Sequence, residues 1–216
     1  MNTIQLQKNI PTTVFTHDQL YSVLESQVNN VNAKISYLTK KGDLIRLKQG
    51  IYIFGDDYRQ SPVNLISAAN MLYAPSYVSF DYALSYYGLI PERVYEITSA
   101  TLRANKLYET PIGRFSYKSI PLRAYSLGID WLYDQENGGQ FIATPEKALC
   151  DKIRYDRGIG RLSIEKAINY LEDDLRIEFN MLITLDAKLI DTIADAYRSN
   201  ILHTVAKVIS KGKRSA

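Results

Sequence analysis

The sequence has little of what enzymes commonly use for catalysis. Its 216 residues include one cysteine, Cys150, and two histidines, His17 and His203. A single cysteine excludes an intramolecular disulfide framework and a cysteine-based zinc cluster, and beside apolar residues on a helix it is usually a buried structural thiol. The two histidines are far apart in the sequence, and neither has a metal-ligand spacing. We therefore expect no metal, no cofactor and no enzymatic activity.

Long apolar segments and phosphate-binding motifs are missing as well. No run approaches the ~18 apolar residues of a membrane span, and residues 1–15 lack the continuous apolar stretch of a signal peptide. We expect a cytoplasmic protein without membrane contact. The dinucleotide-binding fingerprint, the P-loop and the nucleophile elbow are absent, and the Gly-Ile-Gly-Arg sequence at 158–161 is by itself weak evidence for phosphate binding.

Charge is nearly balanced over the chain but not along it. The formal net charge is +3, which does not by itself indicate nucleic acid, and 46% hydrophobic residues suffice for a core. Within residues 30–50, however, Asp43 is opposed by five basic residues, so this segment has a net charge of +4. The five are Lys34, Lys40, Lys41, Arg46 and Lys48.

Residues 15–20 have the form of a helix start. Thr16 is a capping residue and Gln19, three positions later, completes a capping box. Phe15 and Leu20 occupy the two positions of a hydrophobic staple. The pattern predicts a short helix over residues 17–25.

Residues 28–41 predict a second helix, which is amphipathic. Apolar residues recur at three- and four-residue spacing, and Gly42 follows where a left-handed residue ends a helix. Two apolar runs at 44–48 and 51–54, joined through 49–50, then predict a β-hairpin. The apolar stripe is Val28, Val31, Ile35 and Leu38; the opposite face has Asn30, Lys34, Tyr37 and Lys41, flanked by Asn32, Ser36 and Lys40.

Two short helices followed by a hairpin are typical of a winged helix-turn-helix DNA-binding domain. The major groove admits one helix, asparagine pairs with adenine edges, and lysine reaches guanine or phosphate. Arg46 and Lys48 would lie in the wing, along the DNA backbone. The alternative is that helix and hairpin form a small packing unit with a solvated face.

A polar, turn-prone stretch at residues 55–62 predicts a domain boundary, giving domains 1–59 and 60–216. The second domain is expected to be mixed α/β and to become all-helical at its end, so that the fold class is α+β. Ser61 and Pro62 predict the start of its first helix. The other predicted elements are a helix at 79–88, a strand at 94–99, a hairpin at 106–120, a strand at 140–143, a helix capped by Thr144 with Pro145 at its first position, and helices beginning at Ser163 and near Asp186.

Four segments resemble the AbiEi family of antitoxins, which are the transcription-regulator halves of type IV toxin–antitoxin pairs. The resemblance spans residues 15–155 and is weaker beyond residue 160. The segments are KGDLIRLKQGIY at 41–52, YVSFDYALSYYGLIPERVYEIT at 77–98, ETPIGRFSYKSIP at 109–121 and ATPEKALCDKI at 143–153.

The resemblance implies a winged-helix repressor that binds repeats in its own promoter. It also implies a C-terminal domain that neutralises a nucleotidyltransferase-like toxin, typically without a stable complex. The operator contacts implied by the family are those that the helix and hairpin patterns indicate: Asn30, Asn32, Lys34, Ser36, Tyr37, Lys40, Lys41, Arg46 and Lys48.

A second group of basic residues follows in the central part of the chain. It would extend the DNA surface or meet the nucleic-acid substrate of the toxin. Its members are Arg93, Arg103, Lys106, Arg114, Lys118 and Arg123.

Two other functions stay open at this point. One is a stand-alone winged-helix transcription factor whose second domain senses a ligand or a partner. The other is an enzyme that processes nucleic acids or nucleotides and is delivered by the winged helix. In the leading hypothesis, two copies of the chain associate on a DNA repeat.

Overall fold

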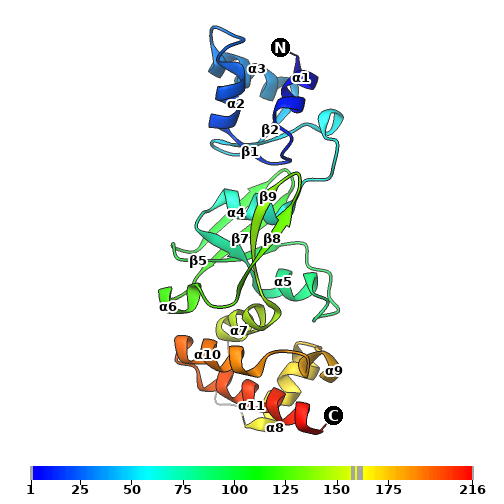
Figure 1. Cartoon of the computed structure of the whole chain (residues 1–216), viewed down its shortest axis with the longest axis vertical. Helices are drawn as coiled ribbons and strands as arrows, with labels where there is room; N and C mark the ends of the chain where they lie inside the picture. Colours follow the sequence, from blue (N-terminus) through cyan, green and yellow to red (C-terminus); the bar gives the residue numbers. More distant parts are fainter. Residues whose placement is uncertain (1, 157–158, 160–162, 216) are drawn as a thin grey trace.

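The computed structural model describes residues 2–156, 159 and 163–215. Helices and a small antiparallel sheet lie at one end, a six-stranded mixed sheet lies in the middle, and helices form the other end (Figure 1). The two termini are at opposite ends of the molecule (Figure 1). This arrangement confirms the α+β class and the helical C-terminal end.

The N-terminal module, residues 2–58, consists of three helices and a three-stranded sheet. The strand order is β1-β3-β2, and both pairings are antiparallel. A short 3-10 helix, Asp56–Tyr58, ends the module. The elements in chain order are α1 (Thr3–Asn9), β1 (Phe15–Thr16), α2 (His17–Leu24), α3 (Val31–Lys41), β2 (Leu44–Lys48) and β3 (Ile51–Phe54).

Local capping signals fix the ends of these helices. Thr16 and Gln19 form the predicted reciprocal capping box of α2. Gly42 ends α3 with a φ of 84°, a left-handed conformation that costs glycine little. Helix α1 was not predicted, although Asn2 and Gln5 form a second reciprocal capping box at its start.

The central sheet has the strand order β6-β7-β5-β4-β9-β8. The pairs β4–β9 and β5–β7 are parallel, and the other neighbours are antiparallel. Strand β8 was not predicted, and the strand expected at 94–99 lies at 97–101. The strands are β4 (Ser76–Val78), β5 (Ile97–Thr101), β6 (Lys106–Thr110), β7 (Gly113–Ser119), β8 (Ile129–Asp134) and β9 (Gly138–Ala143).

Helices pack on both faces of the central sheet. On one face, the Tyr117 hydroxyl donates to the Ala69 carbonyl of α4 at 2.7 Å. On the other, the Tyr77 hydroxyl donates to the Asp151 carboxylate of α7 at 3.0 Å. These helices are α4 (Leu65–Leu72), α5 (Phe80–Tyr86), α6 (Leu122–Tyr125) and α7 (Pro145–Tyr155).

The predicted start of α4 at Ser61 and Pro62 is wrong. The helix begins at Leu65, and the Asn64 side chain caps it by accepting from the Ser67 N–H at 2.9 Å. The Ser61 hydroxyl donates to Glu136 instead, and the Asn64 N–H donates to the Thr13 hydroxyl. Contacts distant in sequence thus override the local signal.

Two of the C-terminal helices begin where the sequence predicted. Ser163 caps the first of them, and Asp186 caps α10. None of the described helices is long and apolar enough to cross a membrane. The elements are α8 (Ile164–Asn169), a π-helical turn (Tyr170–Asp174), α9 (Phe179–Leu182), α10 (Ala187–Tyr197) and α11 (Asn200–Ser215).

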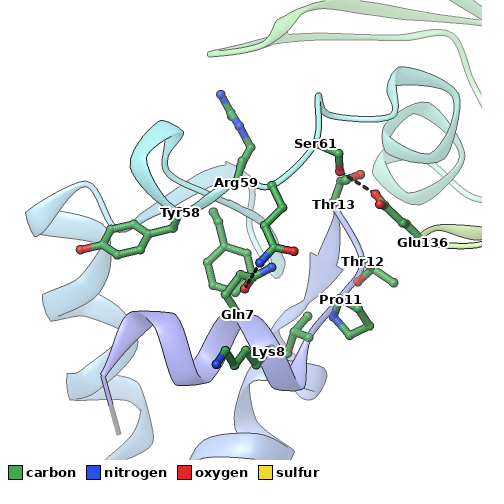
Figure 2. Close-up of a pocket in the computed structure, with 12 residues that line it drawn as sticks. Gln7, Lys8, Pro11, Thr12, Thr13, Tyr58, Arg59, Ser61 and Glu136 are labelled. Atoms are coloured by element: carbon green, nitrogen blue, oxygen red, sulfur yellow. Dashed lines mark hydrogen bonds between the residues drawn. The ribbon is translucent and has the colours of Figure 1, made fainter.

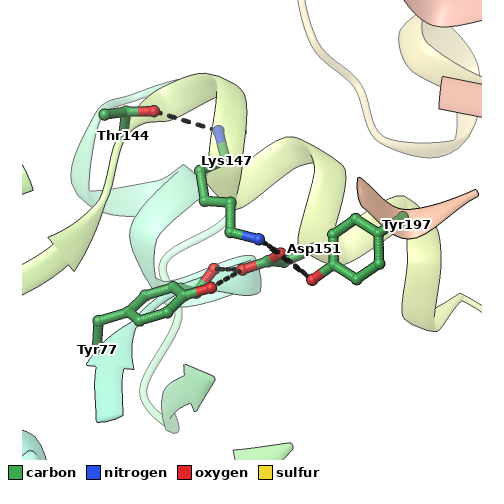
Figure 3. A network of polar contacts seen from close by, with 6 residues as sticks. Tyr77, Thr144, Lys147, Asp151 and Tyr197 are labelled. Carbon is green, nitrogen blue, oxygen red and sulfur yellow. Dashed lines mark hydrogen bonds and ion pairs between the residues drawn. The ribbon is translucent and has the colours of Figure 1, made fainter. Parts of the chain in front are cut away.

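A buried polar network connects α7 to the central sheet and to α10 (Figure 3). Lys147 and Asp151 are fully buried, and their charged groups lie 2.7 Å apart. The Asp151 carboxylate also accepts from the hydroxyls of Tyr77, Ser79 and Tyr197. Because a buried charge is costly unless it is paired and hydrogen-bonded, these contacts offset the desolvation cost of the ion pair in the core.

The small sheet contributes to two cores. Tyr52 and Phe54 of β3 pack against the helices of the N-terminal module. Ile51 and Ile53, on the opposite face of the same strand, belong to the large core that includes the central sheet. Val14 and Leu47 join them. The N-terminal module is therefore attached to the central sheet through apolar packing as well as through the chain.

Candidate nucleic-acid interface

Helix α3 has one buried face and one exposed face, as its sequence predicted. Val31, Ile35 and Leu38 are buried in the core of the N-terminal module. The Tyr37 side chain is 57% exposed, and the Lys34 ammonium lies 5.4 Å from the centre of its ring. The helix therefore presents a polar, basic surface to the outside. Its exposed residues include Asn32, Ser36, Tyr37, Lys40 and Lys41.

The side chain of Asn32 is held by His17. The His17 Nε2 atom lies 2.9 Å from the Asn32 Oδ1 atom, so that the first residue of α2 contacts the first turn of α3. An asparagine oxygen has two lone pairs and its nitrogen has two N–H groups. Asn32 consequently keeps a free acceptor site and its amide donors, which is the combination that pairs with an adenine edge.

Asn30 has a different role from the predicted base contact. It is the N-cap of α3, and its Oδ1 atom accepts from the Ala33 N–H at 2.9 Å. An asparagine N-cap stabilises a helix by about 1 kcal/mol. The placement of Asn30 is thus explained by the start of the helix.

Lys41 is committed to a neighbouring carboxylate. Its ammonium lies 3.2 Å from the buried Asp43 carboxylate, which also accepts from the Thr3 hydroxyl at 2.6 Å. Burial opposes the ionised form of Asp43, but the hydrogen bonds from Thr3 and Lys41 outweigh it and hold the pKa of this carboxyl below its usual value. Lys41 therefore adds little free positive charge to the exposed face.

The two basic residues of the hairpin point to opposite sides of the small sheet. Arg46 pairs with Tyr52, on the face toward the helices, whereas Lys48 pairs with Ile51, on the face toward the central sheet. A β-bulge between them breaks the alternation that would place them on one face.

Lys48 is turned toward the central sheet and is not on a projecting wing. Its ammonium donates to the Leu72 carbonyl at 2.6 Å and lies 5.6 Å from the Tyr108 ring centre. Burial, and next the positive charge of Arg103, lower the pKa of Lys48. The turn of the hairpin is also held at the start of α2, because the Gly50 carbonyl accepts from the His17 N–H at 2.8 Å.

The second group of basic residues does not form one surface. Lys106 pairs with Tyr117 and so lies on one face of the central sheet, while Lys118, the next residue of β7, lies on the other. Arg114 is paired with Glu96 at 3.2 Å and with Glu109 at 3.4 Å. The remaining contacts are Arg93 over Tyr95, Arg103 over Tyr73, Lys106 over Tyr108 and Lys118 over Phe80 and Tyr155, with Arg123 exposed on α6.

A pocket of about 270 Å³ lies where the N-terminal module meets the turn between β8 and β9 (Figure 2). Gln7 and Thr12 line it from the N-terminal module, and Glu136 lines it from the turn. The Ser61 hydroxyl donates to Glu136 at 2.5 Å, closing one side. The pocket is therefore built from both parts of the molecule.

The ionisable groups in the core offer no accessible catalytic site. The side chains of Lys147 and Asp151 are fully buried, so no substrate reaches them in this conformation. Cys150 is buried as expected, and burial raises the pKa of its thiol, which keeps it protonated. In the described ranges no group of histidine, cysteine and acidic residues is arranged to hold a metal. Gly158, Gly160 and Arg161 lie outside the described residues.

The sequence matches no protein-family model, and no curated protein is significantly similar to it.

Proposed function

We propose that the chain is a sequence-specific DNA-binding repressor whose N-terminal module is a winged helix-turn-helix domain. The element order α1-β1-α2-α3-β2-β3 supports this proposal, because a helix pair followed by a hairpin is the architecture that inserts its second helix into the major groove. The observation that carries it is the outer face of α3, which exposes Asn32, Tyr37 and Lys40, with the Lys34 ammonium 5.4 Å from the centre of the Tyr37 ring.

In the proposed complex, α3 enters the major groove and Asn32 contacts a base edge. Lys34 and Lys40 contact the backbone or guanine, and Arg46 contacts phosphate from the edge strand β2. Two copies occupy a promoter repeat and exclude RNA polymerase. Asn30 and Lys41 support the helix, because the first caps it and the second neutralises Asp43.

The proposal is tested by measuring binding to the DNA upstream of the coding sequence and to a scrambled duplex of equal length, at two salt concentrations. We expect a preference of at least about a hundredfold for the upstream DNA. Equal, weak and steeply salt-dependent binding to both duplexes would show only a basic surface and would refute specific repression.

Lys40→Ala is expected to weaken binding to both duplexes alike and to lower the slope of log affinity against log salt by about 1, as for one lost phosphate contact. The slope comes from titrations at several salt concentrations. Lys8→Ala, on the exposed surface of α1, is the matched control and should leave the slope unchanged. An unchanged slope for Lys40→Ala would remove the end of α3 from the interface.

His17→Ala is expected to weaken operator binding about fivefold, because Asn32 loses the hydrogen bond that orients it, a contact of about 1 kcal/mol. Binding to scrambled DNA should not change. The measurement is a double-mutant cycle: in an Asn32→Ala background, His17→Ala should have no further effect. Two additive losses would show that His17 acts independently of Asn32.

We further propose, from the resemblance of residues 15–155 to AbiEi proteins, that the chain is the antitoxin of a type IV pair. The test is co-expression with a neighbouring reading frame for a nucleotidyltransferase-like protein, with growth as the readout. Growth arrest that the chain does not relieve would refute the antitoxin role. Lys40→Ala separates the two activities better than truncation does, because removing residues 1–60 would strip Ile51 and Ile53 from the large core.

A second candidate function is a transcription factor that senses a small ligand. The observation in its favour is the pocket between the N-terminal module and the β8–β9 turn, where the buried Thr12 hydroxyl has no hydrogen-bond partner among the described residues. A coding sequence without a toxin gene beside it, together with operator affinity that changes on addition of a metabolite, would favour this function over the antitoxin.

A further inference from the structure

Three cations gather around two tyrosine rings beside β6, the edge strand of the central sheet. The ammonium groups of Lys48 and Lys106 lie 5.6 Å and 5.7 Å from the centre of the Tyr108 ring. The Arg103 guanidinium lies 5.5 Å from the centre of the Tyr73 ring, and the two rings are 6.0 Å apart. We call Lys48, Arg103 and Lys106 the β6 basic cluster.

The β6 basic cluster lacks neutralising partners. Among the described residues, no carboxylate oxygen lies within 4.0 Å of these three cations, whereas Arg114, at the far end of the same hairpin, pairs with two glutamates. Lys48 is held by a carbonyl oxygen and not by a carboxylate. Like charges brought together without a counter-charge repel one another, and a bound anion relieves that repulsion.

The aromatic rings restrict the motion of the cations before an anion binds. A lysine or arginine placed over a ring is attracted by the π-system and is less mobile than a free side chain. The Tyr73 hydroxyl donates to the Ala104 carbonyl at 3.3 Å, which fixes the ring under Arg103. Less side-chain entropy is then lost when the cations bind phosphate.

The β6 basic cluster is connected to α3 through strand β2. Lys48 ends β2, two residues after Arg46, and Gly42 and Asp43 connect β2 directly to α3. Lys48 thus links the hairpin to β6.

We propose that the β6 basic cluster binds the phosphate backbone of duplex DNA that flanks the sequence read by α3. The ligand class is double-stranded DNA phosphate, and recognition there is independent of base sequence. The inference rests on the proposed function of α3. It gives the central sheet a part in DNA binding and makes affinity depend on the length of the duplex.

The test compares the parent with the double variant Arg103→Gln/Lys106→Gln on two duplexes. One duplex contains the operator core alone, and the other extends it by about one helical turn, ~10 base pairs, on each side. On the long duplex, the salt slope of the variant should be lower by about 2, so that a fourfold rise in salt costs the parent about 15-fold more affinity than the variant. On the short duplex the two proteins should bind equally.

Two controls separate charge from structure. Lys118→Gln lies on the opposite face of the central sheet and should behave as the parent on both duplexes. Arg103→Lys/Lys106→Arg keeps both charges and should keep the salt slope of the parent. Thermal melting of each variant verifies that the fold is intact.

Failure of this inference is distinguishable from failure of the proposed function. If the parent does not prefer its operator, the role of α3 is wrong. If the parent binds its operator and the Gln/Gln variant matches it on the long duplex, only the β6 basic cluster is misassigned. If the Gln/Gln variant lost binding to RNA while its binding to the long duplex was unchanged, the proposal would also be overturned. The cluster would then bind a different nucleic acid.

Discussion

Lys147→Met is expected to lower the free energy of unfolding by about 3 kcal/mol, and Asp151→Leu by about 5 kcal/mol. Both residues are fully buried, and removing one partner strands the other charge in the core. The order of the two effects follows from the remaining contacts. After Lys147→Met, Asp151 still accepts from three hydroxyls. After Asp151→Leu, the Lys147 ammonium keeps one hydrogen bond, to the Tyr197 hydroxyl at 3.2 Å, and its weaker contacts with the Tyr77 and Tyr197 rings.

Urea and thermal denaturation measure both effects. For a chain of this size, about 2–4 °C of Tm accompanies each kcal/mol, so that Lys147→Met should lower Tm by about 6–12 °C. Arg154→Met, on the exposed side of the same helix, is the control and should stay within about 0.5 kcal/mol of the parent. If Asp151→Leu were the more stable of the two core variants, the hydroxyls would not be holding the carboxylate as the structure indicates.

Asn32→Ala is expected to cost about 1–3 kcal/mol of operator affinity, which is roughly 5- to 150-fold, and to leave binding to scrambled DNA unchanged. In the proposed complex the loss is confined to the operator, because the asparagine side chain reads a base edge, whereas a phosphate contact would form on any sequence. Competition titrations with operator duplexes changed at single base pairs would locate the contact, because discrimination at one position should disappear in the variant.

Asn30→Ser is the matched control for Asn32→Ala. Serine also caps helices, so that the start of α3 and its stability should be retained. Operator binding should then be nearly that of the parent. If Asn30→Ser lost as much operator affinity as Asn32→Ala, the amide of Asn30 would read DNA in addition to capping the helix.

The N-terminal module was largely predictable because its signals are local. The Thr16–Gln19 capping box and Gly42 act within a few residues and lie as predicted, and Val31, Ile35 and Leu38 form the buried stripe of α3. The predicted helix start at residue 28 is wrong, because the Asn30 side chain caps the helix and α3 begins at Val31. Helix α1 has the same kind of local signal in Asn2 and Gln5, although it was not among the predicted helices.

The roles of individual site residues were less predictable, because contacts from distant residues decide them. The face of Lys48 depends on a bulge and on the position of Leu72, and neither is visible in the sequence of the hairpin. Lys147 and Asp151 have the i, i+4 spacing of an ordinary surface pair, yet tyrosines from β4 and α10 enclose them. Only the residues that the fold places around such side chains show whether they are exposed or buried.

Because Ile51 and Ile53 of β3 lie in the large core that includes the central sheet, the module proposed to read DNA and the central sheet share one set of apolar contacts. An N-terminal module transferred from another protein would need apolar residues that fit the core of this central sheet. Under the proposed function, new DNA specificity is consequently easier to acquire by changing Asn32, Ser36 or Lys40, which are exposed, than by recombining whole modules. Related chains should therefore differ by substitutions on α3, while the N-terminal module and the central sheet stay together.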